Sequence, residues 1–332
     1  MWLALVGIAC NGNGPEPSSP LPDRAVSIVE LGPADAVAAA DMNGDGVDEI
    51  VRIHGGKVTW PGGSAQVDCA VQVVARGVLA EGDGEQAFLG CGMDRNHMGA
   101  PAQVWSVGSK GAQLLFSRPG ERSQVSDLRV VGGRLWAAIF SSRFDVEGGW
   151  VENEVFTPVY TGRLATKQMP VSEGGVVVGR VYGVAPRSDG DLRLVRGEDK
   201  VKLPTWRGVR SLAAWDPDQD GDLDLLVGDG WHFAYAQQAR ARVLMLEGPD
   251  WDQGRTLGFF PSDYTIRSLH PVGEGVVAVG TRSVQWITRD ALGWTAQELG
   301  AIDETHNAVP AHTKDGPGVV IAGDNALWVP LP

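Results

Sequence analysis

A short apolar pattern, typical of a buried β-strand, recurs seven times along the 332-residue chain. Successive copies begin between 38 and 53 residues apart, and turns rich in glycine or polar residues separate them. The copies are Glu49–Ile53, Ala87–Gly90, Leu135–Ile139, Val176–Gly179, Leu223–Val227, Val276–Val279 and Gly318–Ile321. A period of roughly 40–45 residues is that of a four-stranded propeller blade. We therefore expect an all-β chain that forms a seven-bladed β-propeller over residues 24–332.

Further strands are predicted around each copy. A second strand follows it, as in Lys57–Trp60 and Val155–Tyr160, where apolar and polar residues alternate. A preceding strand is indicated by segments such as Ala36–Ala40 and Val209–Ala214. No long stretch has the 3.6-residue periodicity of an amphipathic helix, which agrees with an all-β fold.

The two ends of the repeat region predict how a ring would close. The segment Ala25–Leu31 precedes the first repeat, and the strand Ala326–Val329 is the last one predicted in the seventh. Pairing of these two segments would complete the last blade with an N-terminal strand and cover edges that invite aggregation. An open solenoid, a pair of β-sandwiches and a propeller with another number of blades are the alternatives.

The first 23 residues have the pattern of an export segment. An apolar run, Trp2–Ala9, ends at Cys10, and Asn11–Asp23 is rich in Gly, Pro and Ser. This pattern resembles a bacterial lipoprotein signal. The resemblance implies a signal over residues 1–10, lipidation of Cys10, a flexible tether over 11–23, and a lipid-anchored protein of the cell envelope, in the outer membrane or at the cell surface. An ordinary secretory signal and a plain apolar terminus are the alternatives.

The other cysteines are even in number. Apart from Cys10 the chain contains Cys69 and Cys91, and it has no CxxC motif. In an oxidising compartment these two could form a disulfide. The alternative is a pair of buried free thiols, because sequence alone does not place two Cα atoms within bonding reach.

Two acidic loops occur at the same place in repeats one and five. Asp41–Glu49 and Asp216–Asp224 both follow D-x-[DN]-x-D-G-x-x-[DE]. Side-chain oxygens at positions one, three, five and nine, with a backbone carbonyl at seven, can surround a hard cation, and Gly at six permits the sharp turn. The expected ligands are Asp41, Asn43, Asp45, the Val47 carbonyl and Glu49, and then Asp216, Asp218, Asp220, the Asp222 carbonyl and Asp224.

Two Ca²⁺ sites are therefore predicted, because so many carboxylates close together repel one another without a cation. An Asp/Gly hairpin turn without a cation is the alternative. Position twelve is Arg52 or Val227, so neither loop is an EF-hand. Both loops instead resemble the calcium loops of FG-GAP/VCBS repeats. That resemblance implies structural calcium in a seven-bladed propeller, as in bacterial secreted proteins and integrin α-subunit heads. The resemblance is weak at residues 81–84 and 188–191, so calcium sites are expected only at the two intact loops.

Composition and missing motifs narrow the function. The net charge of −13 argues against a nucleic-acid partner, whose phosphates it would repel. We find no HExxH, GxSxG, Walker or GxGxxG motif. The expected function is non-enzymatic binding, adhesion or scaffolding of a protein or glycan at a loop face, with membrane contact only through the lipid anchor. The alternative is a polysaccharide-active lyase or hydrolase with its site in the propeller funnel.

One segment is the richest candidate for a ligand patch. Gly228–Tyr235 places several aromatic and polar residues together, among them Trp231, His232 and Tyr235. Exposed aromatic side chains at a propeller rim can stack on sugar rings or contact a protein partner. Packing of the same side chains within the rim is the alternative.

Overall fold

The computed structural model of the chain describes residues 29–67, 69–79, 84–93, 100–118, 122–141, 145–163, 165–171, 174–181, 190–205, 208–230, 241–263, 265–291, 293–301 and 307–332. Three predictions fall outside these ranges. They concern the signal segment with Cys10, the tether over 11–23, and the patch of Trp231, His232 and Tyr235.

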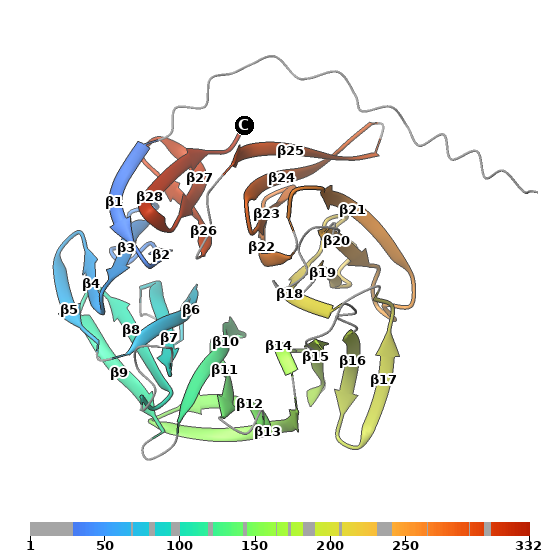
Figure 1. Cartoon of the computed structure of the whole chain (residues 1–332), viewed down its shortest axis with the longest axis horizontal. Coiled ribbons are helices and arrows are strands. Elements are labelled where there is room, and N and C mark those ends of the chain that lie inside the picture. Colours follow the sequence, from blue (N-terminus) through green and yellow to red (C-terminus); the bar gives the residue numbers. More distant parts are fainter. Residues whose placement is uncertain are drawn as a thin grey trace, which may run out of the picture.

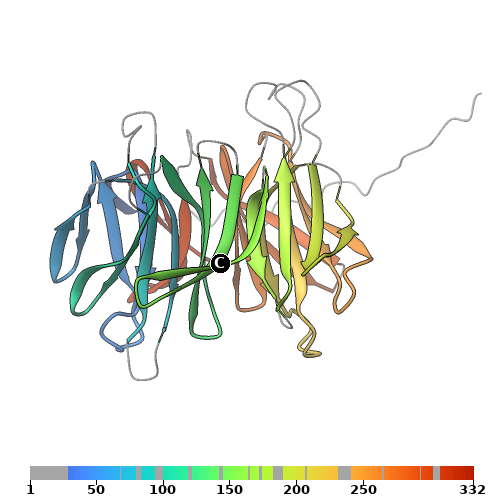
Figure 2. The same cartoon turned by 90° about the horizontal axis from the view of Figure 1, so that it is seen from below.

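Antiparallel strands make up most of the described structure. Within the described ranges, 28 strands form six sheets that lie around a common centre (Figure 1). The one eight-stranded sheet among them consists of two four-stranded meanders, joined through the single pair Gln124 and Gly92. Seen from the side, strands run from one face of the molecule to the other (Figure 2). The fold is therefore all-β and propeller-like. None of the described residues forms a helix long and apolar enough to cross a membrane.

The strands group into four-stranded meanders, which we number in chain order. The first meander contains β2 (Ala36–Ala40), β3 (Glu49–His54), β4 (Lys57–Trp60) and β5 (Gly63–Gln66). The second contains β6 (Ala70–Gly77), β7 (Gln86–Gly92), β8 (Gln103–Gly108) and β9 (Gly111–Ser117). The third contains β10 (Ser123–Val131), β11 (Arg134–Ser141), β12 (Asp145–Glu152) and β13 (Val155–Arg163).

The remaining meanders follow the same order. The fourth contains β14 (Ala165–Pro170), β15 (Val176–Val181), β16 (Gly190–Arg196) and β17 (Asp199–Leu203). The fifth contains β18 (Gly208–Trp215), β19 (Asp224–Gly230), β20 (Ala241–Leu246) and β21 (Gly254–Phe260). The sixth contains β22 (Ile266–Val272), β23 (Gly275–Gly280), β24 (Ser283–Asp290) and β25 (Gly293–Ala301). The seventh contains β26 (Ala308–Thr313), β27 (Gly316–Ile321), β28 (Gly323–Pro330) and β1 (Val29–Ala34).

The seven apolar copies lie in the second strand of each meander, as predicted; one begins a residue early, at Leu223. Their continuous apolar runs have a packing reason. In β23, Val276 and Ala278 pack toward the fifth meander, whereas Val277 and Val279 pack toward the seventh. Both faces of the strand are therefore buried between neighbouring sheets, and no polar face is required.

The prediction that Val155–Tyr160 directly follows the third copy is wrong. The structure inserts β12 between them and makes that segment part of the outermost strand, β13. Gly148 and Gly149 both lie within β12. A Cβ at Gly149 would lie 2.2 Å from the Thr157 carbonyl oxygen, so the close approach of β13 excludes a side chain there.

The N-terminal strand pairs with the last strand of the chain. β1 runs antiparallel to β28, with Val29 opposite Trp328 and Glu30 opposite Leu327. This is the pairing that the sequence predicts for Ala25–Leu31 and Ala326–Val329, seen here from residue 29 onward. A buried apolar cluster also joins the first and seventh meanders, through residues such as Val37 and Val320.

The first strand of each meander lies nearest the centre, and we call these the inner strands (Figure 1). Five of them, β6, β10, β14, β18 and β22, carry a register shift at the equivalent position. Such a β-bulge redirects the next side chain. The residues after the bulges all line one central cavity: Val73, Asp127, Lys167, Ser211 and Ser268.

Candidate metal-binding loops and central cavity

The two acidic loops have equivalent settings. Asp41 and Asp216 each follow the end of an inner strand, β2 or β18. In the first loop, Asp41–Glu49, the Gly46 amide donates to the Asp41 carboxylate at 2.9 Å. In the second loop, Asp216–Asp224, the Gly221 amide donates to Asp216 at 3.2 Å. Equivalent positions thus make the same hydrogen bond, which a chance similarity of two turns would not require.

The backbone of the loops is equivalent as well. Position six is left-handed in both, with φ of 84° at Gly46 and 91° at Gly221. Position four is also left-handed, although it is Gly44 in the first loop and Gln219 in the second. A positive φ is uncommon for a residue with a side chain. The loop conformation is therefore kept at position four even without glycine.

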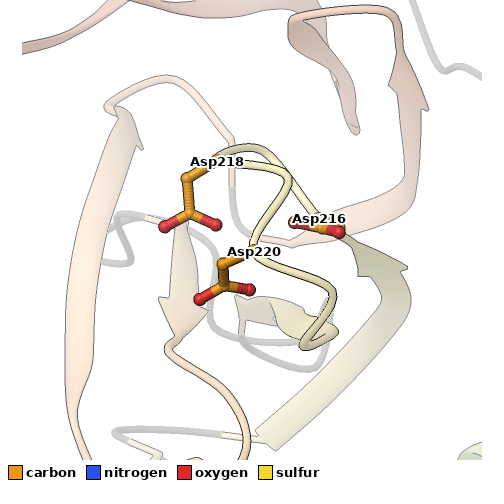
Figure 3. A group of neighbouring side chains, drawn as sticks. All are labelled: Asp216, Asp218 and Asp220. Atoms are coloured by element: carbon orange, nitrogen blue, oxygen red, sulfur yellow. The ribbon is translucent and has the colours of Figure 1, made fainter.

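The second loop brings three predicted ligands together. One carboxylate oxygen from each of Asp216, Asp218 and Asp220 lies within 4.8 Å of the others. Figure 3 shows all three side chains on this single loop. The Oδ1 atom of Asp216 is buried and has no hydrogen-bond partner, which is costly unless something else satisfies it. The fourth predicted carboxylate, Asp224, accepts a hydrogen bond from the Gly248 amide at 2.8 Å and is not part of this group.

Asp224 is a perturbed carboxyl group near these aspartates. Burial raises the pKa of Asp224, and the nearby charges of Asp218 and Asp220 raise it further, although the Gly248 amide opposes the shift. A bound cation would offset this repulsion. Three oxygen donors at this spacing and the unsatisfied Asp216 atom fit a hard cation such as Ca²⁺. Asp216, Asp218 and Asp220 would hold it, and the ion would supply charge neutralisation.

The first loop is organised by an amide. The Asn43 side chain donates to Asp45 at 3.1 Å and to Glu49 at 2.7 Å, so its amide nitrogen lies between two of the predicted ligands. Its Oδ1 atom accepts a hydrogen bond from the Asp45 backbone amide at 2.9 Å. Asp41 accepts hydrogen bonds from the backbone of Gly44 and of Asp45. The carboxylates of this loop do not form a group as compact as that of the second loop.

A wide cavity lies beside the second loop, on the face where the acidic loops connect inner strands to their neighbours. Its volume is about 800 Å³, and Gly221, Asp222 and Leu223 form part of its wall. The Trp251 indole donates to the Leu223 carbonyl at 2.7 Å and fixes the loop in this position. We call this space the outer cavity. The second loop is therefore one part of the wall of the outer cavity.

A narrower cavity of about 290 Å³ lies among the inner strands, and we call it the inner cavity. Arg76, Arg129 and His270 line both spaces, so the two meet at these residues. Volumes of this size are in the range of small-molecule sites.

A buried carboxylate organises cations in the inner cavity. Asp127 forms an ion pair with Arg129 at 3.1 Å and lies 3.8 Å from Lys167. Burial alone would raise the pKa of Asp127, but these two cations and the Gln168 amide hold it below the usual value. Arg129 also donates to the backbone of Gln168 and Leu212, at 3.0 and 2.9 Å. One arginine thus ties the third, fourth and fifth meanders together.

His270 is the perturbed histidine of this region. Burial lowers the pKa of His270 to about 4, a hydrogen bond to the Ala308 backbone opposes the shift, and the charges of Arg76, Arg129 and Lys167 lower it further. The ring is therefore neutral near pH 7. Its Nε2 atom is buried without a hydrogen-bond partner. Sequence reasoning missed this residue, because the groups around it come from separate repeats.

Cys69 and Cys91 are joined by a disulfide with a Cα–Cα distance of 5.6 Å. Both cysteines are buried in the apolar cluster between the first and second meanders. The bridge links the start of the second meander to its second strand, β7.

Comparisons with known proteins support the fold and give no information on function. No protein-family model matches the chain, and no curated protein matches it. Among solved structures, the crystal structure of Saccharomyces cerevisiae Sqt1 is similar, with a TM-score of 0.53 and 12% sequence identity over 89% of this chain and 84% of that one. Sqt1 is a WD40 propeller. At this identity the likeness extends to the propeller-like all-β architecture and not to function.

Proposed function

We propose that this protein is a calcium-stabilised, seven-bladed β-propeller of the FG-GAP/VCBS type that acts as a non-enzymatic binding module. The observation that carries the proposal is the equivalence of the two acidic loops, one of which forms a wall of the outer cavity. The ligand, a protein or a glycan, binds on the face that carries these loops. Binding sites are commonly placed on loops that a rigid scaffold positions.

Contacts between the first and seventh meanders support a closed ring. The pairing of β1 with β28 completes the seventh meander as a four-stranded unit. Apolar clusters join successive meanders, and one of them joins the seventh to the first. Closure would bury the faces of every meander, because each is then covered on both sides by a neighbour.

The calcium sites are tested by thermal unfolding of the chain with calcium and with an excess of EGTA. An ion that binds the folded chain at one hundred times its dissociation constant stabilises it by about 2.7 kcal/mol. We expect a higher melting temperature with calcium, and a smaller shift with magnesium, which retains more of its own water. A melting temperature that does not respond to chelation would refute the calcium sites.

Export to the cell envelope is part of the same proposal. The Cys69–Cys91 disulfide favours an oxidising compartment. The apolar run that ends at Cys10 favours lipid anchoring. Metabolic labelling with a palmitate analogue tests the anchor, and Cys10→Ser is expected to abolish the label. Label that persists in this variant would refute lipidation at Cys10.

A second candidate function is polysaccharide lyase activity. The candidate base is His270, whose Nε2 atom has no hydrogen-bond partner among the described residues and lies beside the cations of the inner cavity. A neutral histidine beside cations can remove the proton next to a uronate carboxylate, after which the bond to the leaving sugar oxygen breaks and that oxygen takes up a proton. The product carries a new carbon–carbon double bond, so ultraviolet absorbance detects it. Absorbance that rises with wild-type protein but not with His270→Gln would favour the lyase over the binding module.

A further inference from the structure

The lining of the central cavities is richer in cations than the chain as a whole. The chain carries a net charge of −13, yet cations outnumber carboxylates among the described residues that line the two spaces. The cations are Arg76, Arg129, Lys167, Arg196 and Arg267, and the carboxylates are Asp127 and Asp222. A cleft that concentrates one sign of charge attracts ligands of the other sign.

The cations of the inner cavity come from four different meanders. Arg76 lies on β6, Arg129 on β10, Lys167 on β14 and Arg267 on β22. The exposed fraction of the side chain falls from 44% at Arg76 to 20% at Lys167 and 19% at Arg129. The charge is therefore partly shielded from water, where an ionic contact is stronger than at an open surface.

Arg267 is the least satisfied of these cations. It is half-buried and lines the inner cavity. Its side chain has no hydrogen bond or ion pair with any other residue in the part of the chain that the structure describes. Arg129 has N–H groups to spare as well, since a guanidinium has five and its contacts to Asp127, Gln168 and Leu212 leave some of them unused. Planar guanidinium groups match the two oxygens of a carboxylate.

His270 adds an acceptor to this cationic site. Its Nε2 atom is buried and unpartnered where the inner and outer cavities meet. A neutral imidazole that donates through one nitrogen accepts through the other. The atom can therefore accept a hydrogen bond from a hydroxyl of a ligand held by the arginines.

We infer that the inner cavity binds a sugar acid, with its carboxylate on Arg267 and Arg129 and a ring hydroxyl donating to Nε2 of His270. The outer cavity accommodates further sugar units of the same chain, beside the wall formed by the second loop. An acidic peptide would place carboxylates on the arginines but offers few hydroxyl donors, and phosphate lacks the sugar ring whose hydroxyls would extend toward the outer cavity. This inference deepens the proposed function and rests on the ligand binding at the loop face.

The experiment is isothermal titration calorimetry of the full chain with trigalacturonate, at fixed free calcium and with a blank titration of ligand into calcium buffer. Galactotriose, which lacks the carboxylates, inorganic phosphate and a short polyglutamate peptide are titrated in parallel. We expect saturable binding of trigalacturonate that weakens at higher salt, and much weaker binding of the other three.

Variants locate the site. Arg267→Gln is expected to weaken trigalacturonate binding about tenfold, because it removes one charge-assisted contact. Arg267→Lys keeps the charge and should restore part of that loss. Arg289→Gln removes the same charge from an exposed position on β24 and should leave affinity unchanged. Since Arg267 has no partner among the described residues, its replacement should not lower the melting temperature, which is measured for each variant.

The outcomes separate the two proposals. A chain that melts at a higher temperature with calcium but does not bind trigalacturonate overturns the sugar-acid site and leaves the calcium-stabilised module in place. Tighter binding of phosphate or polyglutamate, or equal affinities in the two glutamine variants, also overturns it. Binding that depends on Arg267 in a chain indifferent to calcium supports the site and overturns the calcium part of the proposed function.

Discussion

The side-chain amide of Asn307 makes two hydrogen bonds to the backbone of Val37, a residue 270 positions away. Its Oδ1 accepts from the Val37 amide at 2.9 Å, and its Nδ2 donates to the Val37 carbonyl at 2.8 Å. Near the other end of β26, the backbone amide of His312 donates to the Asp48 carboxylate at 2.6 Å. Polar contacts therefore join the seventh meander to the first along the inner strands. The side-chain amide of Asn307 thus makes with β2 the two hydrogen bonds that the backbone of a neighbouring strand would otherwise make.

Replacing Asn307 by alanine should destabilise the chain. The change leaves a backbone donor and acceptor of Val37 unpaired, and we expect a loss of about 2 kcal/mol in the free energy of unfolding. Urea denaturation measures it. Asn325→Ala, at an exposed position of the same sheet, is the matched control and should change stability by less than about 0.5 kcal/mol. Equal effects of the two substitutions would remove Asn307 from the contacts that hold the ring ends together.

Replacing Asp220 by asparagine should reduce stabilisation by calcium. The change removes one of three carboxylates that lie within 4.8 Å of one another but keeps the side-chain volume. Without calcium the variant should be as stable as wild type or slightly more stable, because repulsion is relieved. With calcium it should gain less in melting temperature. Asp199→Asn, exposed on β17, is the control with the same loss of charge, and a shift equal to that of Asp220→Asn would count against the site.

Stability should fall as the pH decreases from about 6.5 to 4, in a way that depends on His270. The folded pKa of His270 is about 4, below its ordinary value of 6.5, so the unfolded chain takes up the proton first. Arg76, Arg129 and Lys167 oppose the charged ring, and the Ala308 backbone favours it. Between pH 7 and 4, wild type should lose on the order of 2 kcal/mol more than His270→Gln does. Parallel pH profiles of unfolding free energy would contradict this assignment.

Removing the disulfide should lower stability without changing the fold. The bridge closes a loop across 22 positions of sequence, which corresponds to about 3 kcal/mol through the entropy of the unfolded chain. Replacing Cys69 and Cys91 together by serine should therefore lower the denaturant midpoint, and a reductant should have the same effect on wild type. Adding reductant to the double variant should leave its midpoint unchanged. A further drop of the midpoint on adding reductant would show that the reductant acts on something other than this disulfide.

The strand pattern could be predicted because a strand that is buried between neighbouring sheets needs a short run of consecutive apolar residues. Apolar runs such as Val276–Val279 are readable wherever they occur, since both faces of the strand need apolar side chains. The prediction was wrong at β12, which lies between the third apolar copy and Val155–Tyr160 and which contains Gly148 and Gly149. A side chain at either glycine would collide with atoms of other strands, so glycine is required there by packing.

The sequence by itself determined the strands and the two acidic loops, because each depends on residues a few positions apart. Only the tertiary structure decided what lies at the centre. Arg76, Arg129, Lys167 and Arg267 are far apart along the chain and belong to no motif, but the inner strands bring them to one cavity. Asp48 lies beside the predicted ligand Glu49, yet it pairs with Arg76 at 3.0 Å and binds the backbone of His312. Such roles depend on which strands become neighbours around the centre, and the residues next to each position in the sequence do not determine those neighbours.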